Sequence, residues 1–162
     1  MGNEVTTPQS EQDGIMIYNT AFEASLRVLI ILSVSSIDLS ADKIVAIDFT
    51  TTYGKDFGIS DFNLHGDGIF RYAEIPARRD LISHAIKGLV TKGLITPNCL
   101  LSGFTYTITP MGSKFVKSLK SNYSKAYKKL CERSIKFYES KDDKQSLDVL
   151  NNYANTFTKA GI

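Results

Sequence analysis

The sequence predicts a mainly α-helical chain with a small β-hairpin, arranged as a winged helix-turn-helix with a C-terminal helical extension. Three segments with helical spacing of apolar residues come first, then two short strand-like runs, then a further helical pattern. The pieces "GLVTKGLI" and "YTITPMG" supply a helix that ends at glycine, two strands and a Thr-Pro pair that begins the next helix. This order of elements is typical of a winged helix.

Length and composition indicate a folded chain with one core. The chain has 162 residues, of which 43% are hydrophobic and 22% charged, close to the averages of globular proteins. We predict three parts: a polar, flexible N-terminal tail (1–14), a winged-helix core (15–112) and a C-terminal helical extension (113–162).

The first helix is expected to begin near Asn19, where Thr20 and Glu23 have the spacing of a capping box. The run "LRVLIILSV" then makes the helix apolar on most sides, so the helix is predicted to be buried. The run is too short to cross a bilayer. Because a charge on so apolar a helix needs a partner, we expect Arg27, with Phe22 and Glu23, to lie partly in the core and partly in a buried polar network.

The second helix is expected to begin at Ser40, a good N-cap residue, with Asp42 in its first turn. It should end near Gly54, because β-branched residues and glycine are poor helix formers. The segment 54–75 then holds four glycines. A stretch of this length without regular structure is uncommon in a compact domain and is often functional.

The third helix is expected after residue 75, with Pro76 in its first turn and Gly93 at its C-terminal end. Its apolar stripe consists of Leu81, Ile82, Ala85, Ile86, Leu89 and Val90. Two strands should follow, separated by a loop that contains Pro97 and Gly103.

Thr109 is expected to cap one long helix whose apolar side continues from Val116 to Phe137. Its opposite side carries a row of lysines: Lys114, Lys117, Lys125, Lys128 and Lys136. Residues 146–158 are expected to form a last helix.

Charge is distributed unevenly along the chain. Residues 1–75 contain 4 Lys or Arg and 11 Asp or Glu, whereas residues 76–140 contain 12 and 3. Either the two halves attract each other within the fold, or they contact partners of opposite charge.

Two interpretations of the basic side chains remain open. They either contact DNA or form the solvated faces of amphipathic helices. Asp80 interrupts the basic face of the third helix, and that face lacks an Asn or Gln to read adenine, which weighs against sequence-specific recognition. The candidates for DNA contact are Arg78, Arg79, Lys87, Lys92, Lys114, Lys117, Lys125 and Lys128.

No motif in the sequence predicts an enzyme, a metal site or a cofactor. "KDFG" resembles a kinase signature by chance, because the chain lacks the other kinase motifs. His65 and Asp67 alone do not make a metal site, and Cys99 and Cys131 lack the spacing of zinc ligands. Thiols without a secretory signal favour the cytoplasm.

Several short motifs resemble one family. The segments are "YNTAFEASLRVLIIL" (18–32), "DFG" (56–58), "LH" (64–65) and "FRYAEIPARRDLISHAIKGLVTKGLI" (70–95). Together they resemble the middle component of ABC-three-component systems, including the small subunit of Lamassu-type anti-phage defence, over about residues 15–135. The positions that match are Asn19, Phe22, Glu23, Arg27, Asp56, Phe57, Gly58, Leu64, His65, Arg71, Glu74, Arg78 and Arg79.

The resemblance implies a non-catalytic adaptor. In such systems a large SMC-like ABC ATPase senses DNA, an effector such as a nuclease acts on it, and the middle component joins the two. The resemblance gives as candidate partner-binding residues Asp56, Phe57, Leu64, His65, Arg71, Glu74, Arg78 and Arg79. The cluster of Arg71, Glu74, Arg78 and Arg79 either holds the 54–75 loop on the helix or faces the ATPase or effector. A stand-alone winged-helix DNA-binding regulator is the alternative.

Overall fold

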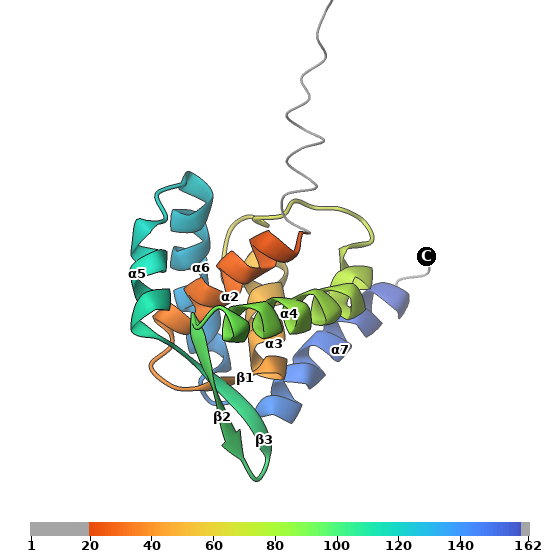
Figure 1. The fold of residues 1–162 in the computed structure, drawn as a ribbon. Helices are drawn as coiled ribbons and strands as arrows, with labels where there is room; N and C mark the ends of the chain where they lie inside the picture. The colour runs from red at the N-terminus through yellow and green to blue at the C-terminus, as the bar shows by residue number, and fades with distance from the viewer. Residues whose placement is uncertain (1–19, 160–162) are drawn as a thin grey trace, which may run out of the picture.

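The computed structural model describes residues 20–159. The predicted tail (1–14) and Asn19 lie outside these residues. In chain order the elements are α2 (Ala21–Val34), β1 (Leu39–Ser40), α3 (Ala41–Thr52), the 3-10 helix η1 (Gly54–Phe57), the 3-10 helix η2 (Arg71–Ala73), α4 (Glu74–Thr91), β2 (Ile95–Leu100), β3 (Gly103–Ile108), α5 (Pro110–Ser118), α6 (Asn122–Tyr138) and α7 (Asp143–Lys159) (Figure 1). The prediction of a mainly helical chain with a small β-hairpin is confirmed.

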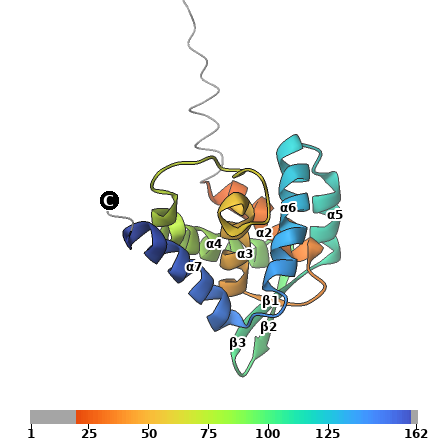
Figure 2. The same cartoon turned by 180° about the vertical axis from the view of Figure 1, so that it is seen from behind.

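The helices surround α3. It packs against α2, α4, α6 and α7, and Figure 2 shows α6 and α7 on either side of it. Side chains from the segment 113–162, among them Tyr127, Tyr138 and Leu150, are buried in the same hydrophobic core as those of α2 and α3. The domain boundary between 112 and 113 stays a prediction. None of the described helices is long and apolar enough to cross a membrane.

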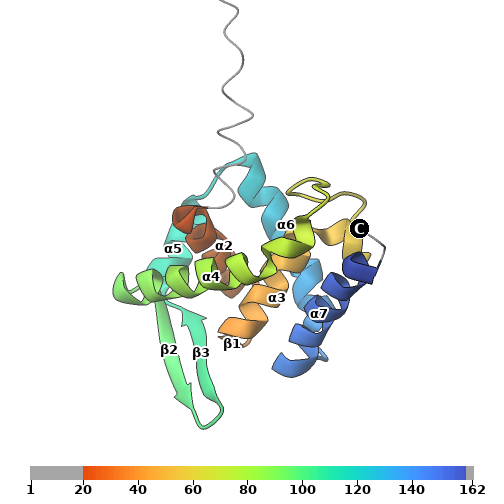
Figure 3. The same cartoon turned by 90° about the vertical axis from the view of Figure 1, so that its right-hand side faces the viewer.

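The described strands form one antiparallel sheet in the order β1-β3-β2. The hairpin β2–β3 projects from the helical body (Figure 3). Strand β1 has two residues and therefore no periodicity, so the sequence pattern does not predict it. Pro97 lies within β2 and not in the loop, which corrects that expectation. The sheet accepts a proline there because β2 is an edge strand, where one N–H has no ladder partner.

Local side-chain hydrogen bonds begin the helices at the expected residues. Thr20, Ser40 and Thr109 each accept a backbone N–H of the first turn of α2, α3 and α5. At the end of α4, Gly93 has a positive φ of 72°. The N–H groups of Gly93 and Leu94 donate to helix carbonyls in the pattern of a Schellman motif.

The prediction of a single long helix after Thr109 is wrong. The chain leaves the helix at Leu119, and Ser121 caps a new helix by accepting the N–H of Ser124 at 3.1 Å. The apolar spacing continues across this break, which is why the spacing alone did not reveal it. Helices α5 and α6 therefore run in opposite directions, side by side (Figures 1 and 2).

The position of Phe22 also corrects an expectation. Its side chain is 65% exposed, so it belongs to the surface of α2 and not to the core. Arg27, in contrast, is 1% exposed and has the buried partner that the sequence predicts.

Candidate functional site

Asp48 on α3 is the centre of a buried polar network. Its Oδ1 accepts from Arg27 Nε at 2.8 Å and from the Tyr127 hydroxyl at 2.5 Å, and its Oδ2 accepts from Arg78 Nη1 at 3.4 Å. Burial on its own raises the pKa of the Asp48 carboxyl, but the two guanidinium groups outweigh it and lower the pKa below the ordinary value. One carboxylate thus connects α2, α3, α4 and α6.

Arg78 extends this network to the start of α4. Its guanidinium donates to Thr52 Oγ1 at 2.5 Å and to Glu74 Oε2 at 2.9 Å, and the Tyr53 hydroxyl donates to the same Glu74 carboxylate at 2.8 Å. Arg78 is 3% exposed. Its side chain therefore lies in the interior, where it joins α4 to α3, whereas the DNA and partner interpretations require an exposed group.

Asp56 is the centre of a second cluster, which fixes the 54–75 segment. Arg71 binds it with two hydrogen bonds, Nε to Oδ2 at 2.5 Å and Nη2 to Oδ1 at 2.9 Å. The Tyr153 hydroxyl on α7 donates to Oδ2 at 2.6 Å, and Asn63 donates to Oδ1 at 3.3 Å. Burial raises the pKa of Asp56, but these donors outweigh it and lower the pKa. The ring of Phe57 stacks on Tyr153, with centroids 4.9 Å apart.

His65 attaches the same segment to α3 and α6. Its backbone N–H donates to the Thr52 carbonyl at 3.1 Å, and its Nε2 lies 2.6 Å from the Tyr123 hydroxyl. Leu64 packs against the hydrophobic core. Burial, followed by repulsion from Arg78 and Arg27, lowers the pKa of His65 to about 2. The imidazole is therefore neutral in the folded chain.

A neutral His65 predicts a pH-dependent stability. The unfolded chain takes up a proton at this residue below about pH 6.5, whereas the folded chain does not, so stability falls as the pH drops through that value. We expect protonation of His65 in the unfolded chain to lower the free energy of unfolding by about 1 kcal/mol between about pH 6.5 and 5.5. Urea unfolding at both pH values measures the loss.

His65→Gln should remove this part of the slope. His84→Gln, which alters an exposed histidine on α4, is the matched control and should retain it. Equal slopes in wild type and His65→Gln would contradict the account.

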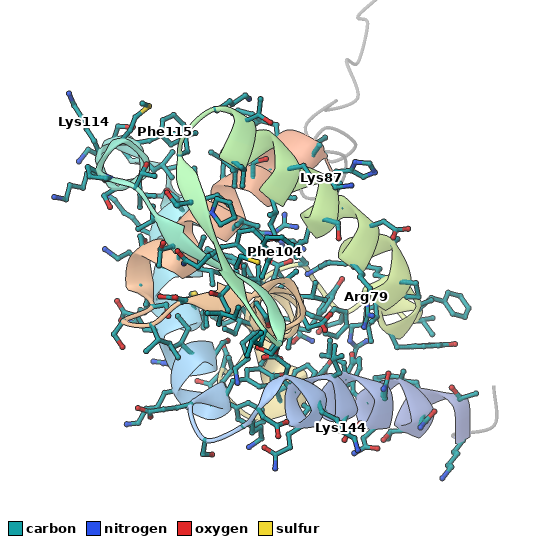
Figure 4. All side chains as sticks on the ribbon, turned by 60° about the horizontal axis from the view of Figure 1, so that its bottom comes forward. Arg79, Lys87, Phe104, Lys114, Phe115 and Lys144 are labelled. Atoms are coloured by element: carbon teal, nitrogen blue, oxygen red, sulfur yellow. The ribbon has the colours of Figure 1, made fainter. Side chains whose placement is uncertain are left out.

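The other basic candidates are exposed and come from different elements. Arg79 and Lys87 lie on α4 and Lys114 on α5 (Figure 4). Lys92 follows α4, Lys117 lies on α5, and Lys125 and Lys128 lie on α6. The break at Leu119 divides the predicted row of lysines between two antiparallel helices.

Sequence analysis did not single out the exposed apolar side chains. At the hairpin tip Leu100, Leu101 and Phe104 are exposed, Leu101 fully. Phe62, Ile69 and Phe70 are exposed on the 54–75 segment. The sequence does indicate that this hairpin is uncharged, because no Asp, Glu, Lys or Arg occurs in residues 93–113. A projecting, uncharged hairpin with apolar residues at its end is unusual for a surface in water.

Comparison with known proteins supplies the family. Residues 17–160 match the model of the ABC-three component (ABC-3C) system Middle Component 2. No curated protein and no solved structure was found to match the chain. The matched region spans all the described elements, and it contains both polar clusters. The chain belongs to the Middle Component 2 family of ABC-three component systems.

Proposed function

We propose that this chain is a non-catalytic adaptor that joins an SMC-like ABC ATPase to an effector, such as a nuclease, in a cytoplasmic, Lamassu-type anti-phage defence complex. The observation that carries the proposal is the family match over residues 17–160, because a middle component of a multi-component system has protein partners. The further identification of the partners rests on the resemblance of the sequence motifs.

The winged-helix assignment is part of the proposal. Helix α2, strand β1, helices α3 and α4 and the hairpin β2–β3 follow one another in the order expected of that fold. The sheet order β1-β3-β2 also supports it. Winged helices serve both as DNA readers and as protein-binding modules, so the assignment does not choose between these functions.

The chemistry of the hairpin favours a protein partner. Neutralising the charge of DNA phosphates requires Lys or Arg, and residues 93–113 contain neither. Leu101 and Phe104 instead offer exposed apolar groups that lose contact with water when a partner covers them. Buried aromatic and aliphatic anchors of this kind carry much of the energy of protein interfaces.

The alternative function, a DNA-binding regulator, is favoured by one observation. Arg79, Lys87 and Lys92 are exposed on or just after α4, the helix that a winged helix places in the major groove. That regulator would bind duplex DNA without partners. Its affinity would fall steeply with salt and would be lost on replacement of Arg79 and Lys87.

Co-expression tests the adaptor proposal. The tagged full-length chain is expressed with the products of its neighbouring genes and captured, and the captured proteins are identified. We expect the ATPase in an amount comparable to the chain, and duplex DNA bound by the complex but not by the isolated chain. Capture of the chain alone, combined with tight binding of duplex DNA by that isolated chain, would favour the regulator.

Variants of the hairpin test in the same capture experiment whether its tip contacts a partner. Replacing Leu101 and Phe104 with serine should weaken capture of a partner about tenfold or more, because anchors of this type cost more than about 1 kcal/mol each when truncated. Met111→Ser is the matched control, since Met111 is an exposed apolar residue outside the hairpin. If the control and the hairpin variant capture equal amounts, the hairpin does not anchor the complex.

A further inference from the structure

Helices α5 and α6 enclose a groove that neither polar cluster uses. The groove has a volume of ≈ 380 Å³. This size lies at the lower end of the range of about 300–1,000 Å³ for ligand pockets. Residues of both helices line it, together with the buried Ile30 of α2. A few large apolar side chains fit into such a space, whereas a whole helix does not.

The groove has an apolar floor and a cationic rim. Ile30 is 2% exposed, and Val116 and Leu119 are half-buried, so these three side chains form the floor. The rim consists of the exposed residues Lys117, Lys120, Lys125 and Lys128. Among the residues that the structure describes, no Asp or Glu lines the groove. Within residues 20–159, no carboxylate lies at ion-pair distance from any of the four ammonium groups.

An apolar floor with a cationic rim fits a binding partner that is both apolar and anionic. Four lysines that have no carboxylate partner in the described part of the chain attract an anion, and an apolar floor gains free energy only when apolar groups cover it. DNA phosphates satisfy the first condition but not the second. The lining contains no Arg, Asn or Gln to read bases. An acidic amphipathic helix satisfies both conditions, because apolar side chains at positions i, i+3 and i+4 enter the groove while flanking carboxylates reach the lysines.

We propose that the α5–α6 groove binds an acidic amphipathic helix of a protein partner. The inference deepens the proposed adaptor function and rests on it. It assigns Lys117, Lys125 and Lys128, which the sequence offers as DNA contacts, to a protein partner.

The test uses the full-length chain and a fluorescent probe peptide of about 15 residues, a length that supports a helix. The probe has Leu at positions i, i+3, i+4 and i+7 and Glu at most others. A second peptide keeps Glu and replaces Leu with Ser, and a third keeps Leu and replaces Glu with Lys. A labelled DNA duplex of similar length is the fourth probe. Binding is followed by fluorescence anisotropy at about 0.1 M salt.

Two variants carry the same change of charge. In the groove variant Lys117, Lys125 and Lys128 become Gln, and in the control variant Lys87, Lys92 and Lys144 become Gln. All six are exposed, so neither variant should unfold the chain. We expect the groove variant to bind the Leu/Glu peptide about tenfold more weakly, which is the effect of losing three surface ion pairs. The control should stay within about twofold of wild type.

The other probes decide between occupants. The Ser/Glu and Leu/Lys peptides should bind at least tenfold more weakly than the Leu/Glu peptide. Equal binding of the Ser/Glu peptide, tighter groove-dependent binding of the duplex, or no binding of the Leu/Glu peptide would each overturn the inference. If the groove variant still captures both the ATPase and the effector in co-expression as well as wild type does, the groove inference fails while the adaptor function stands. If the wild-type chain captures no partner, the adaptor function itself fails.

Discussion

Replacing Asp48 with Asn should lower the free energy of unfolding by about 3–5 kcal/mol, the usual cost of removing one partner from a buried ion pair. Asn has nearly the same shape as Asp, so the loss reports charge and not a cavity. Arg27 and Arg78, 1% and 3% exposed, would remain in the core without a carboxylate between them. Small domains have about 5–15 kcal/mol of stability in total, so the variant keeps little of it.

Urea unfolding followed by circular dichroism measures this loss. Asp61→Asn is the matched control, because Asp61 is exposed, and its change should stay within about 0.5 kcal/mol. Tyr127→Phe removes only the hydroxyl that donates to Asp48 and should cost about 1.5–3 kcal/mol. That second variant keeps the prediction testable if Asp48→Asn does not fold. A loss at Asp48 no larger than at Asp61 would contradict the account.

The polar network around Asp48 also predicts how the free energy of unfolding lost in Asp48→Asn depends on pH. The pKa of Asp48 is lower in the folded chain than in the unfolded one, so its stabilisation is complete above the ordinary value of about 3.9 and falls as the pH drops below it. The difference in stability between wild type and Asp48→Asn should therefore shrink below about pH 4.

Gly112→Ala should destabilise the chain by about 1–3 kcal/mol, the usual cost of overfilling a packed site. Gly112 lies in the first turn of α5, where the helix meets the start of β2. A Cβ there would overlap the backbone carbonyl oxygen of Leu94 and come within 2.7 Å of Ile108 Cγ1. That carbonyl also accepts from the Thr109 N–H at 3.0 Å, so it does not move freely.

Gly88→Ala is the matched control, and it is expected to raise the free energy of unfolding. Gly88 lies in α4 with no heavy atom within 4 Å of an added Cβ, so alanine should stabilise the helix by about 0.5–1 kcal/mol. Thermal and urea unfolding of both variants compare the same chemical change at two sites. A Gly112→Ala variant as stable as Gly88→Ala would show that the junction of α5 and β2 is not closely packed.

Local chemistry explains which parts of the fold the sequence predicts. The caps at Thr20, Ser40 and Thr109 depend on a hydroxyl and an N–H three residues later, and both are visible in the sequence. Ser121 and Ser124 have the same spacing, but apolar residues continue at helical spacing across this point, so the sequence predicted one unbroken helix. Strand β1 has no local signal, because it exists only by pairing with β3, more than 60 residues away.

The polar clusters show more clearly which contacts the sequence alone does not predict. Arg27 predicts a buried partner, but only the packing of α2 on α3 identifies that partner as Asp48, 21 residues away. Arg78 and Arg79 are the same residue type with opposite environments. A signal was available: the residues four and eight positions after Arg78 are Ile82 and Ile86 of the apolar stripe, whereas those after Arg79 are Ser83 and Lys87.

The central claim is that this chain links two partners, and a bridging experiment tests it most directly. The tagged ATPase is captured from cells that express the effector with or without this chain, and the captured effector is quantified. The account predicts that the effector is captured with the ATPase only when the chain is present. Capture of equal amounts of effector in the absence of the chain would contradict it.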